Sequence, residues 1–334
     1  MSYNLRKNET ITIVSFASQN PDRQSELRDG VGRIFAGRPH TLQFPCDEND
    51  AAAALPEAEI LLTWSTRLTE VLFREAKRLR WAHIGDAGVE RCLFPAMVES
   101  EVALTNSSGI HGQYMSEWTL AVLFYLSQGL SEAEAWKHDR DWKQHKAAFL
   151  GKRFLLEEKR ALIIGYGQIG RAVAAKLQGI GMDTNGVVSK LRPAEIPLYA
   201  TGDLARIIGG YDVVVIAIPF TSETDRLFDY EMLQRMKPGS ILVNLARGKV
   251  IDEPALVEAL ENGPLGFAAL DVFAKEPLPE GSRLFALPNV LMTPHVSGNF
   301  PEYTIKVHEL FLDNLARYVN GRPLRNVVDK KRGY

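Results

Sequence analysis

One stretch of this chain limits its possible folds more than any other. Arg160 to Gly181 reads RALIIGYGQIGRAVAAKLQGIG, an apolar run followed by a glycine turn and an Ala- and Leu-rich segment with helical periodicity. This order predicts a strand, a tight turn and a helix. In such a G-x-G-x-x-G turn the first glycine permits the turn, the second lets a pyrophosphate approach bare backbone, and the third lets helix and strand pack closely.

A glycine-rich turn alone is weak evidence, because such turns also serve plain strand-to-helix packing. Here the strand before the turn and the helix after it both favour dinucleotide binding. The amides at the start of the helix would face phosphate oxygens at the positive end of the helix dipole. The expected cofactor residues of this turn are Gly165, Gly167, Gln168, Ile169 and Gly170.

Length and charge narrow the possibilities further. At 334 residues the chain is longer than one hydrophobic core usually sustains, so we expect two domains. A net charge of -2, from 39 basic and 41 acidic side chains, gives no electrostatic reason to expect nucleic acid or an anionic membrane. The expected partner is therefore a small molecule.

The two cysteines, Cys46 and Cys92, lie far apart without ligand-like spacing. We therefore predict no disulfide framework and no metal site, and we expect both to be small buried side chains. The polar start MSYNLRKNET differs from a secretion signal, and the longest apolar run, Leu120 to Leu126, is too short to cross a bilayer. These features favour a cytoplasmic location.

The first third of the chain reads as a small α/β unit of its own. Its last predicted strand leads into the loop Gly85 to Glu90, at a strand end of the kind where open α/β sheets collect ligands. The amides of Gly88 and Val89 could hold an anion there, although a loop without a ligand is an equally open reading. The predicted strands are Ile11–Phe16, Ile60–Trp64 and Trp81–Ile84, with helices at Pro21–Ala36 and Leu68–Leu79.

The middle of the chain changes character. Ser116 to Leu130 is predicted to form one long apolar helix, which we expect to be buried either between the two domains or by a second subunit. The basic and aromatic stretch that follows, Trp136 to Lys146, also has acidic neighbours, so we interpret it as a solvated helix face.

Beyond the glycine turn, strands and helices alternate, which predicts a doubly wound parallel sheet buried on both faces. The last helix is expected at Glu302 to Val319, and the charged tail from Asp329 to Tyr334 is expected to fray. The strands are expected at Val187 and Val188, Tyr211–Pro219, Ser240–Ala246, Gly266–Val272 and Asn289–Pro294.

Four ionisable residues follow strands of this second sheet: Arg247, Asp271, Glu276 and His295. Parallel strands deliver their carboxyl ends to one edge, so these side chains should converge where the nicotinamide end of a dinucleotide would reach. A lone His or Arg is more often structural. The four together, with Glu276 available to orient His295, predict a catalytic site.

Several motifs in order resemble the D-isomer-specific 2-hydroxyacid dehydrogenase family along nearly the whole chain. The likeness rests on the AGV loop at Ala87, GIHG at Gly109, GYGQIG, AIPFTSET at Ala217, NLARGKVID at Asn244, DVFAKEP at Asp271 and TPH at Thr293. It implies two doubly wound parallel-sheet α/β domains, with a Rossmann-type cofactor domain (106–297) inserted in a flavodoxin-like substrate domain (1–105 and 298–334). It also implies a homodimer built through the long helical arm.

The resemblance also implies roles for these residues. Arg247 would bind the carboxylate and carbonyl oxygen of a 2-oxo acid, and His295 would donate the proton as hydride arrives. Glu276 would orient His295 and stabilise its protonated form, while Asp271 would bind the nicotinamide carboxamide. The amides of Gly88 and Val89 would complete the carboxylate site. Further cofactor contacts are expected at Met115, Ile218, Pro219, Thr224 and Ala246, and substrate contacts at Trp64 and Ser65, where core packing is as plausible for Trp64.

Cofactor choice depends on the end of the strand after the glycine helix. NAD enzymes place an acidic residue there, which binds the adenosine ribose. This chain has Val188 or Ser189 at that place, followed by Lys190 and Arg192, which can pair with a 2′-phosphate, so NADP is favoured over NAD. A solvated basic loop is the alternative reading.

The predicted reaction is reduction of a 2-oxo acid such as glyoxylate or hydroxypyruvate to the D-2-hydroxy acid. Two alternatives stay open. A dehydrogenase of formate or phosphite would share the fold. A formate-type site pairs its His with Gln, so the presence of Glu276 argues against it. A dinucleotide-sensing corepressor would share the fold and the three catalytic residues but typically has added tails.

Overall fold

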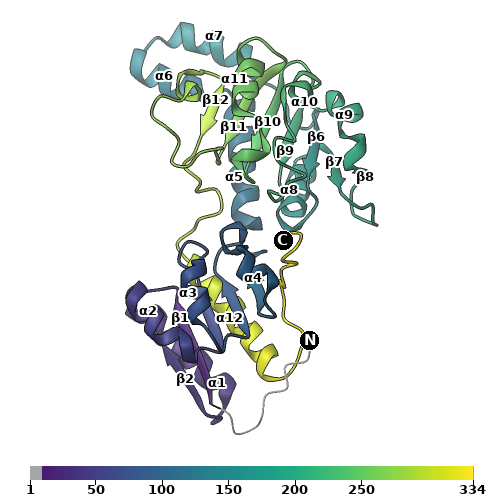
Figure 1. Cartoon of the computed structure of the whole chain (residues 1–334). Coiled ribbons are helices and arrows are strands. Elements are labelled where there is room, and N and C mark those ends of the chain that lie inside the picture. The colour runs from purple at the N-terminus through teal and green to yellow at the C-terminus, as the bar shows by residue number, and fades with distance from the viewer. Residues whose placement is uncertain (1–9, 334) are drawn as a thin grey trace. The chain divides into compact units, whose positions relative to one another are not determined.

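The computed structural model describes residues 10–333, and the chain divides into two compact units (Figure 1). Unit 1 comprises residues 1–110 and 300–334, and unit 2 comprises residues 111–299. The chain thus leaves unit 1 after Ile110 and returns at Phe300, compared with the expected crossings after residues 105 and 297. Each unit is an α/β sandwich around a parallel sheet, as the sequence predicts.

The sheet of unit 1 has five parallel strands in the order β2-β1-β3-β4-β5. Three of them, β1 (Ile11–Phe16), β3 (Ile60–Thr63) and β4 (Trp81–Ile84), lie where the apolar runs predict strands. The apolar pattern did not predict β2 (His40–Gln43) or β5 (Ala103–Asn106). The missed β2 alternates exposed and half-buried residues, because it lies at the edge of the sheet.

Helices cover both faces of this sheet. One face, which includes Ile13 and Leu62, packs against α1 (Pro21–Phe35) and α12 (Tyr303–Val319). The other, which includes Leu61 and Ile84, packs against α2 (Glu48–Ala54), α3 (Glu70–Glu75) and α4 (Pro95–Glu99). Figure 1 shows α12, in yellow, lying among the purple and blue elements of the N-terminal third. The last helix of the chain therefore completes the core of the first domain.

Two expectations for this unit are wrong. The tail after α12 is held in place rather than frayed, because Val328 is buried and Lys330 Nζ donates to the carbonyl oxygens of Met97, Ser100 and Val102. Burial also lowers the pKa of Lys330. Of the two cysteines, Cys92 is buried as expected, but Cys46 is exposed, since it lies in the surface segment between β2 and α2.

The sheet of unit 2 has seven parallel strands in the order β12-β11-β10-β9-β6-β7-β8. The order reverses beside β6, the strand that enters the glycine turn, so that turn lies at the topological switch point where such sheets bind ligands. The strands are β6 (Arg160–Ile164), β7 (Asp183–Val188), β8 (Leu198–Ala200), β9 (Val213–Ile216), β10 (Ser240–Asn244), β11 (Leu265–Leu270) and β12 (Val290–Met292).

The helices of unit 2 also form two layers. Alternate residues of the central strands, such as Val214 and Val215, face opposite cores. One core includes α5 (Gly112–Ser127) and α8 (Gln168–Gly179). The other includes α9 (Leu204–Ile207), α10 (Tyr230–Gln234) and α11 (Glu253–Glu261). Short 3₁₀ turns in the two units span Leu55–Glu57, Glu90–Cys92, Thr201–Asp203, Ile208–Gly210, Gly248–Val250 and Arg283–Ala286.

The predicted apolar helix is α5, and its inner face is covered within the unit. Val122 and Leu123 are buried in the same core as α8, while Phe124 is exposed. The stretch that follows forms two helices, α6 (Ser131–Asp139) and α7 (Trp142–Lys152), which carry further exposed apolar side chains. None of the helices in the described part of the chain has the length and hydropathy needed to cross a bilayer.

Candidate active site

The glycine turn of unit 2 combines two crowded positions with one open position. Gly165 has a φ of 96°, and a Cβ there would lie 2.5 Å from the carbonyl oxygen of Ala217. A Cβ at Gly170 would overlap the carbonyl oxygen of Gly165. At Gly167, by contrast, no described residue apart from its immediate chain neighbours comes within 4 Å of such a Cβ. The turn is therefore tight where helix and strand meet and open where a phosphate would approach.

The open glycine is also the N-cap of α8, and within residues 10–333 no side chain caps this helix end. The amides of Gln168 and Ile169, in the first turn of the helix, thus lie at the positive end of the helix dipole beside the open position. Oriented amides with free space in front of them fit the pyrophosphate of a dinucleotide.

The loop after β7 lies beside this turn. The strand ends at Val188, which is buried, and Ser189, Lys190 and Arg192 are exposed, so Ser189 is the first residue beyond the strand. Arg192 Nη2 donates to the carbonyl oxygen of Tyr166, within the glycine turn, at 2.7 Å. A cationic side chain is thus attached to the turn itself.

The other expected cofactor contacts are distributed around the same edge of the sheet. After β9, the side chain of Ile218 packs against Gly165, and the hydroxyl of Thr224 donates to the carbonyl oxygen of Pro219 at 2.8 Å. Ala246 and Met115 are each 8% exposed.

The NLARG turn after β10 is organised by a residue to which the sequence analysis gave no role. The buried side chain of Asn244 accepts a hydrogen bond from Ala246 N at 3.1 Å and donates one to Arg247 O at 3.1 Å. A Cβ at Gly248 would overlap the backbone of Phe273 and Ala274, so this turn packs directly against the loop that carries Glu276. Arg247 Nη1 donates to Ala246 O at 2.7 Å.

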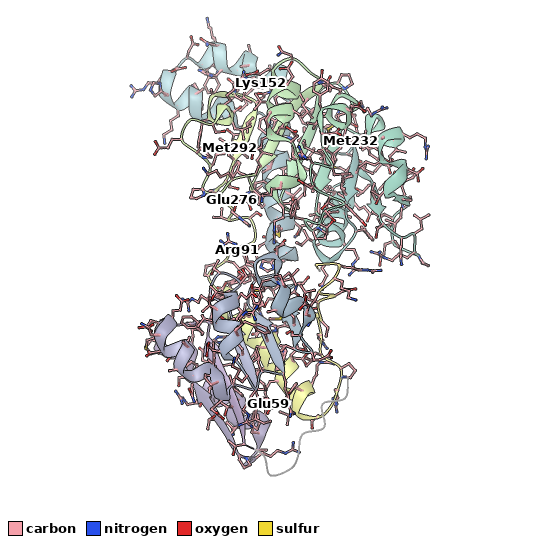
Figure 2. The ribbon with its side chains drawn as sticks, in the orientation of Figure 1. Glu59, Arg91, Lys152, Met232, Glu276 and Met292 are labelled. Atoms are coloured by element: carbon pink, nitrogen blue, oxygen red, sulfur yellow. The ribbon has the colours of Figure 1, made fainter. Side chains whose placement is uncertain are left out.

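The predicted pairing of Glu276 with His295 is present. His295 Nδ1 lies 2.8 Å from Glu276 Oε2, and the other carboxylate oxygen, Oε1, accepts from Phe273 N at 3.0 Å. The carboxylate is thus fixed by the backbone on one side and orients the imidazole on the other. Both residues line a pocket of about 510 Å³ together with apolar side chains such as Phe285 and Met292 (Glu276 and Met292 are labelled in Figure 2).

Asp271 is hydrogen-bonded to the loop that carries His295. Its buried carboxylate accepts four hydrogen bonds, from the hydroxyls of Thr293 and Ser297 and the amides of Val296 and Ser297. A carboxylate has about four acceptor sites, so these bonds fix its position and organise the loop on either side of His295. Contact of Asp271 with a nicotinamide carboxamide stays a prediction.

The four expected substrate residues gather at one edge of the sheet of unit 1. Trp64 is half-buried, stacks on Tyr303 at a ring-centroid distance of 5.6 Å, and packs against Gly85. Its indole N–H donates to Ala17 O at 2.5 Å. The amide of Ser65 donates to Asp86 Oδ2 at 2.6 Å, in the loop that continues to Gly88 and the buried Val89.

The sequence therefore indicated the site residues that follow strands, but not the residues whose hydrogen bonds fix those site residues in place. Asn244 stands inside a quoted motif, and its position before the turn was the only signal for it. Ser297 contacts Asp271 across 26 residues of sequence, and no local pattern indicates such a contact.

Comparison with known proteins agrees with this geometry. The sequence profile of the NAD binding domain of the D-isomer specific 2-hydroxyacid dehydrogenases matches residues 120–297. A glyoxylate reductase from Thermococcus gammatolerans is 32% identical over 80% of this chain and 81% of its own length. The chain spans about half the length of the D-3-phosphoglycerate dehydrogenase of Archaeoglobus fulgidus, 52%, at 29% identity.

Solved structures show the same likeness. A D-isomer specific 2-hydroxyacid dehydrogenase family protein from Aeromonas salmonicida has a TM-score of 0.83 and 31% identity, covering 96% of this chain and 100% of that one. An NADPH-dependent glyoxylate/hydroxypyruvate reductase from Sinorhizobium meliloti, solved with NADP and sulfate, has a TM-score of 0.80 and 26% identity, covering 97% and 100%. The chain belongs to the D-isomer specific 2-hydroxyacid dehydrogenase family.

Proposed function

We propose that this protein reduces a 2-oxo acid to the D-2-hydroxy acid with NADPH. The observation that carries the proposal is the pair formed by His295 Nδ1 and Glu276 Oε2 at 2.8 Å, on the sheet edge that also bears the glycine turn. With Nδ1 engaged by a carboxylate, the ring is oriented to donate a proton from Nε2 to a substrate oxygen.

The bound nicotinamide would supply the hydride. The side chain of Asn244 bonds to the backbone of Ala246 and Arg247 and so fixes the turn after β10. The guanidinium of Arg247 would bind the substrate carboxylate and stabilise charge on the carbonyl oxygen. His295 would deliver the proton to that oxygen as the hydride arrives. The amides of Gly88 and Val89 would complete the carboxylate site, and Trp64 and Ser65 would contact the substrate side chain.

For the cofactor we favour NADP over NAD. The support is the cationic loop after β7: Arg192 is attached to the glycine turn, and Ser189 and Lys190 are exposed beside it. A guanidinium and an ammonium pair well with a phosphate dianion, whereas the ribose hydroxyls of NAD give them little to bind. The Sinorhizobium meliloti reductase solved with NADP agrees with this choice.

For the substrate we favour glyoxylate or hydroxypyruvate, in line with the reductases that the chain resembles. We also propose a homodimer built through the α5–α7 arm, because exposed apolar side chains gather there: Phe124, Leu130, Trp136, Trp142 and Leu150.

The test is an assay of reduced-cofactor oxidation with glyoxylate, hydroxypyruvate, pyruvate and phenylpyruvate, each with NADPH and with NADH. We expect turnover with at least one 2-oxo acid, a higher kcat/KM with NADPH, and the D-isomer as the product of hydroxypyruvate by chiral chromatography. Absence of turnover with every 2-oxo acid, or formation of the L-isomer, would contradict the proposal.

A further inference from the structure

Tyr166 connects the glycine turn to the loop after β7 through two separate contacts. Its carbonyl oxygen accepts from Arg192 Nη2 at 2.7 Å, and its hydroxyl donates to Glu195 Oε2 at 3.0 Å. We call these two contacts the Tyr166 bridge. The motif G-x-G-x-x-G leaves this position open to any residue, so nothing in the turn itself requires a tyrosine here.

The tyrosine ring is well packed. Tyr166 is 5% exposed and lies in one core with Val188, the last residue of β7, and Ile196, which is 4% exposed. Its Cβ lies 3.5 Å from the position that a Cβ on Gly186 would take. Beyond the loop, Gly186 N donates to Pro197 O at 2.9 Å, which returns the chain to β7. The ring is therefore held in the core. The segment from Ser189 to Glu195 is exposed, and the buried residues Val188 and Ile196 flank it.

We propose that Tyr166 and Glu195 are positioning residues for cofactor specificity: the Tyr166 bridge holds Arg192 in place to receive the 2′-phosphate of NADP. This inference rests on the NADP preference proposed above. An exposed arginine on an unsupported loop loses side-chain and backbone entropy when it binds an anion. Arg192 is instead bonded to the turn, and its loop is bonded again at Glu195. Binding the phosphate therefore costs less conformational entropy.

The carboxylate of Glu195 introduces an opposing effect, because a negative charge near a phosphate is repulsive. Its hydrogen bond to its own backbone and the bond from Tyr166 hold the pKa of Glu195 below its usual value, so it stays ionised. Cationic groups lie nearby: Arg171 acts on both partners of the bond, and Arg192 acts on Tyr166. Lys190 lies on the same loop. Repulsion between exposed charges is screened by salt, whereas loss of the bond removes one of the two contacts that tie the loop to Tyr166. The bridge should therefore outweigh the repulsion.

The test compares four variants of the full chain by calorimetric titration with NADP⁺, NAD⁺ and adenosine 2′,5′-bisphosphate. Tyr166→Phe removes only the hydroxyl, and Glu195→Ala removes its acceptor. Each should weaken NADP⁺ and the bisphosphate roughly threefold to tenfold, the scale of one net hydrogen bond, and leave NAD⁺ unchanged. Glu195→Gln removes the charge but keeps an oxygen that accepts from Tyr166, so it should bind NADP⁺ nearly as the wild type does. Tyr230→Phe, at a tyrosine that is 55% exposed on α10, is the matched control and should change nothing.

Tighter NADP⁺ binding in both Glu195 variants would overturn the inference, because it would mean that repulsion dominates. Equal weakening of NADP⁺ and NAD⁺ would overturn it as well, because it would mean that the bridge only supports the fold.

Arg192→Ala separates this inference from the proposed cofactor preference. If it weakens NADP⁺ while Tyr166→Phe does not, the loop reads the phosphate without the bridge. If it leaves the ratio of NADP⁺ to NAD⁺ affinity unaltered, the phosphate is not read by Arg192, and the preference and the inference both fall.

Discussion

His295 is held in a backbone conformation that few residues adopt. Its φ is 54°, in the left-handed region, which costs a non-glycine residue roughly 1 kcal/mol or more. Its amide donates to Asp271 O at 2.8 Å, and the Asp271 carboxylate accepts from the next two amides, Val296 and Ser297. These bonds offset the cost, and they direct the imidazole toward Glu276. Strain at this residue is thus supported by the buried carboxylate of Asp271.

We expect His295 and Glu276 to carry the proton transfer. His295→Ala should lower kcat by at least roughly 10²-fold, because a positioned acid is lost. Glu276→Gln keeps an oxygen that accepts from Nδ1, so it should shift the pH profile of kcat/KM and retain part of the activity. Steady-state kinetics against pH will measure both. Glu280→Gln, at an exposed carboxylate in the same loop, is the control and should match the wild type. Unchanged turnover in His295→Ala would remove His295 from the chemistry.

At the scale of elements, the glycines of the turn between β6 and α8 have different roles, some in the fold and one in cofactor binding. Gly165 and Gly170 are crowded by backbone and are needed for the fold, whereas Gly167 has an ordinary φ of -83° and open space beside it. An alanine is thus compatible with the backbone at Gly167 but would place a methyl group where the phosphate approaches.

We therefore predict that Gly167→Ala changes the melting temperature little and weakens dinucleotide binding at least roughly tenfold. Differential scanning fluorimetry and calorimetric titration will measure the two effects. Gly202→Ala, at another glycine with no described atom within 4 Å of its Cβ position, is the control and should bind as the wild type does. A variant that binds normally would show that the pyrophosphate lies elsewhere.

The packing of α12 on unit 1 includes a buried histidine. His308 is 4% exposed, and among the described residues no partner for either ring nitrogen is present. Burial lowers its pKa from 6.5 to about 4, with Glu26 and Arg23 of α1 acting in opposite directions. Burial and the charge of His308 also lower the pKa of His83, to about 3.

Because the folded-state pKa of His308 lies below 6.5, the unfolded chain binds more protons between these values. The free energy of unfolding should thus fall as pH drops from about 6.5 toward 4. His308→Leu removes this term, so its loss of stability between roughly pH 7.5 and roughly pH 5 should be smaller than that of the wild type by roughly 1–2 kcal/mol. Urea denaturation at the two pH values will measure it. His138→Leu, at a side chain that is 90% exposed, is the control. An equal loss in His308→Leu and wild type would contradict the prediction.

At the scale of the whole molecule, the α5–α7 arm carries exposed apolar side chains. Trp142 is 63% exposed and Leu150 is 68% exposed, and Trp142 meets Trp136 edge-to-face at 5.4 Å. Monomeric soluble proteins rarely expose large apolar patches, so we expect these side chains to be covered. A symmetric pair of these arms is the arrangement we propose.

We predict sedimentation of the wild type at twice the chain mass of 37.3 kDa at micromolar concentration, with an interface above roughly 2,000 Å². The double variant Trp142→Glu with Leu150→Glu should sediment as a monomer, because four charges would then lie in the contact. Val71→Glu, at an equally exposed apolar residue of α3 in unit 1, is the control and should remain a dimer. A wild type that sediments as a monomer would refute this arrangement.

Local pattern determined much of this protein. The pattern of apolar residues predicted most of the strands of both sheets, because a strand that is buried on one or both faces needs apolar residues at nearby positions in the sequence. The glycine spacing and the rule that parallel strands end at one edge then predicted the turn and the pairing of Glu276 with His295. The edge strands β2, β5 and β8 were missed, since they contain few large apolar residues in a row, unlike the similarly short ILLT of β3.

Only the tertiary structure decided which polar groups are already engaged. The Asp271 carboxylate accepts four hydrogen bonds from the loop from Thr293 to Ser297. The tail is held because Lys330 donates to three carbonyl oxygens of the α4–β5 segment. Glu195, likewise, reaches Tyr166 across 29 residues. Such contacts depend on which loops the sheets bring together, and a hydrogen bond between distant residues leaves no period or spacing in the sequence from which to read it.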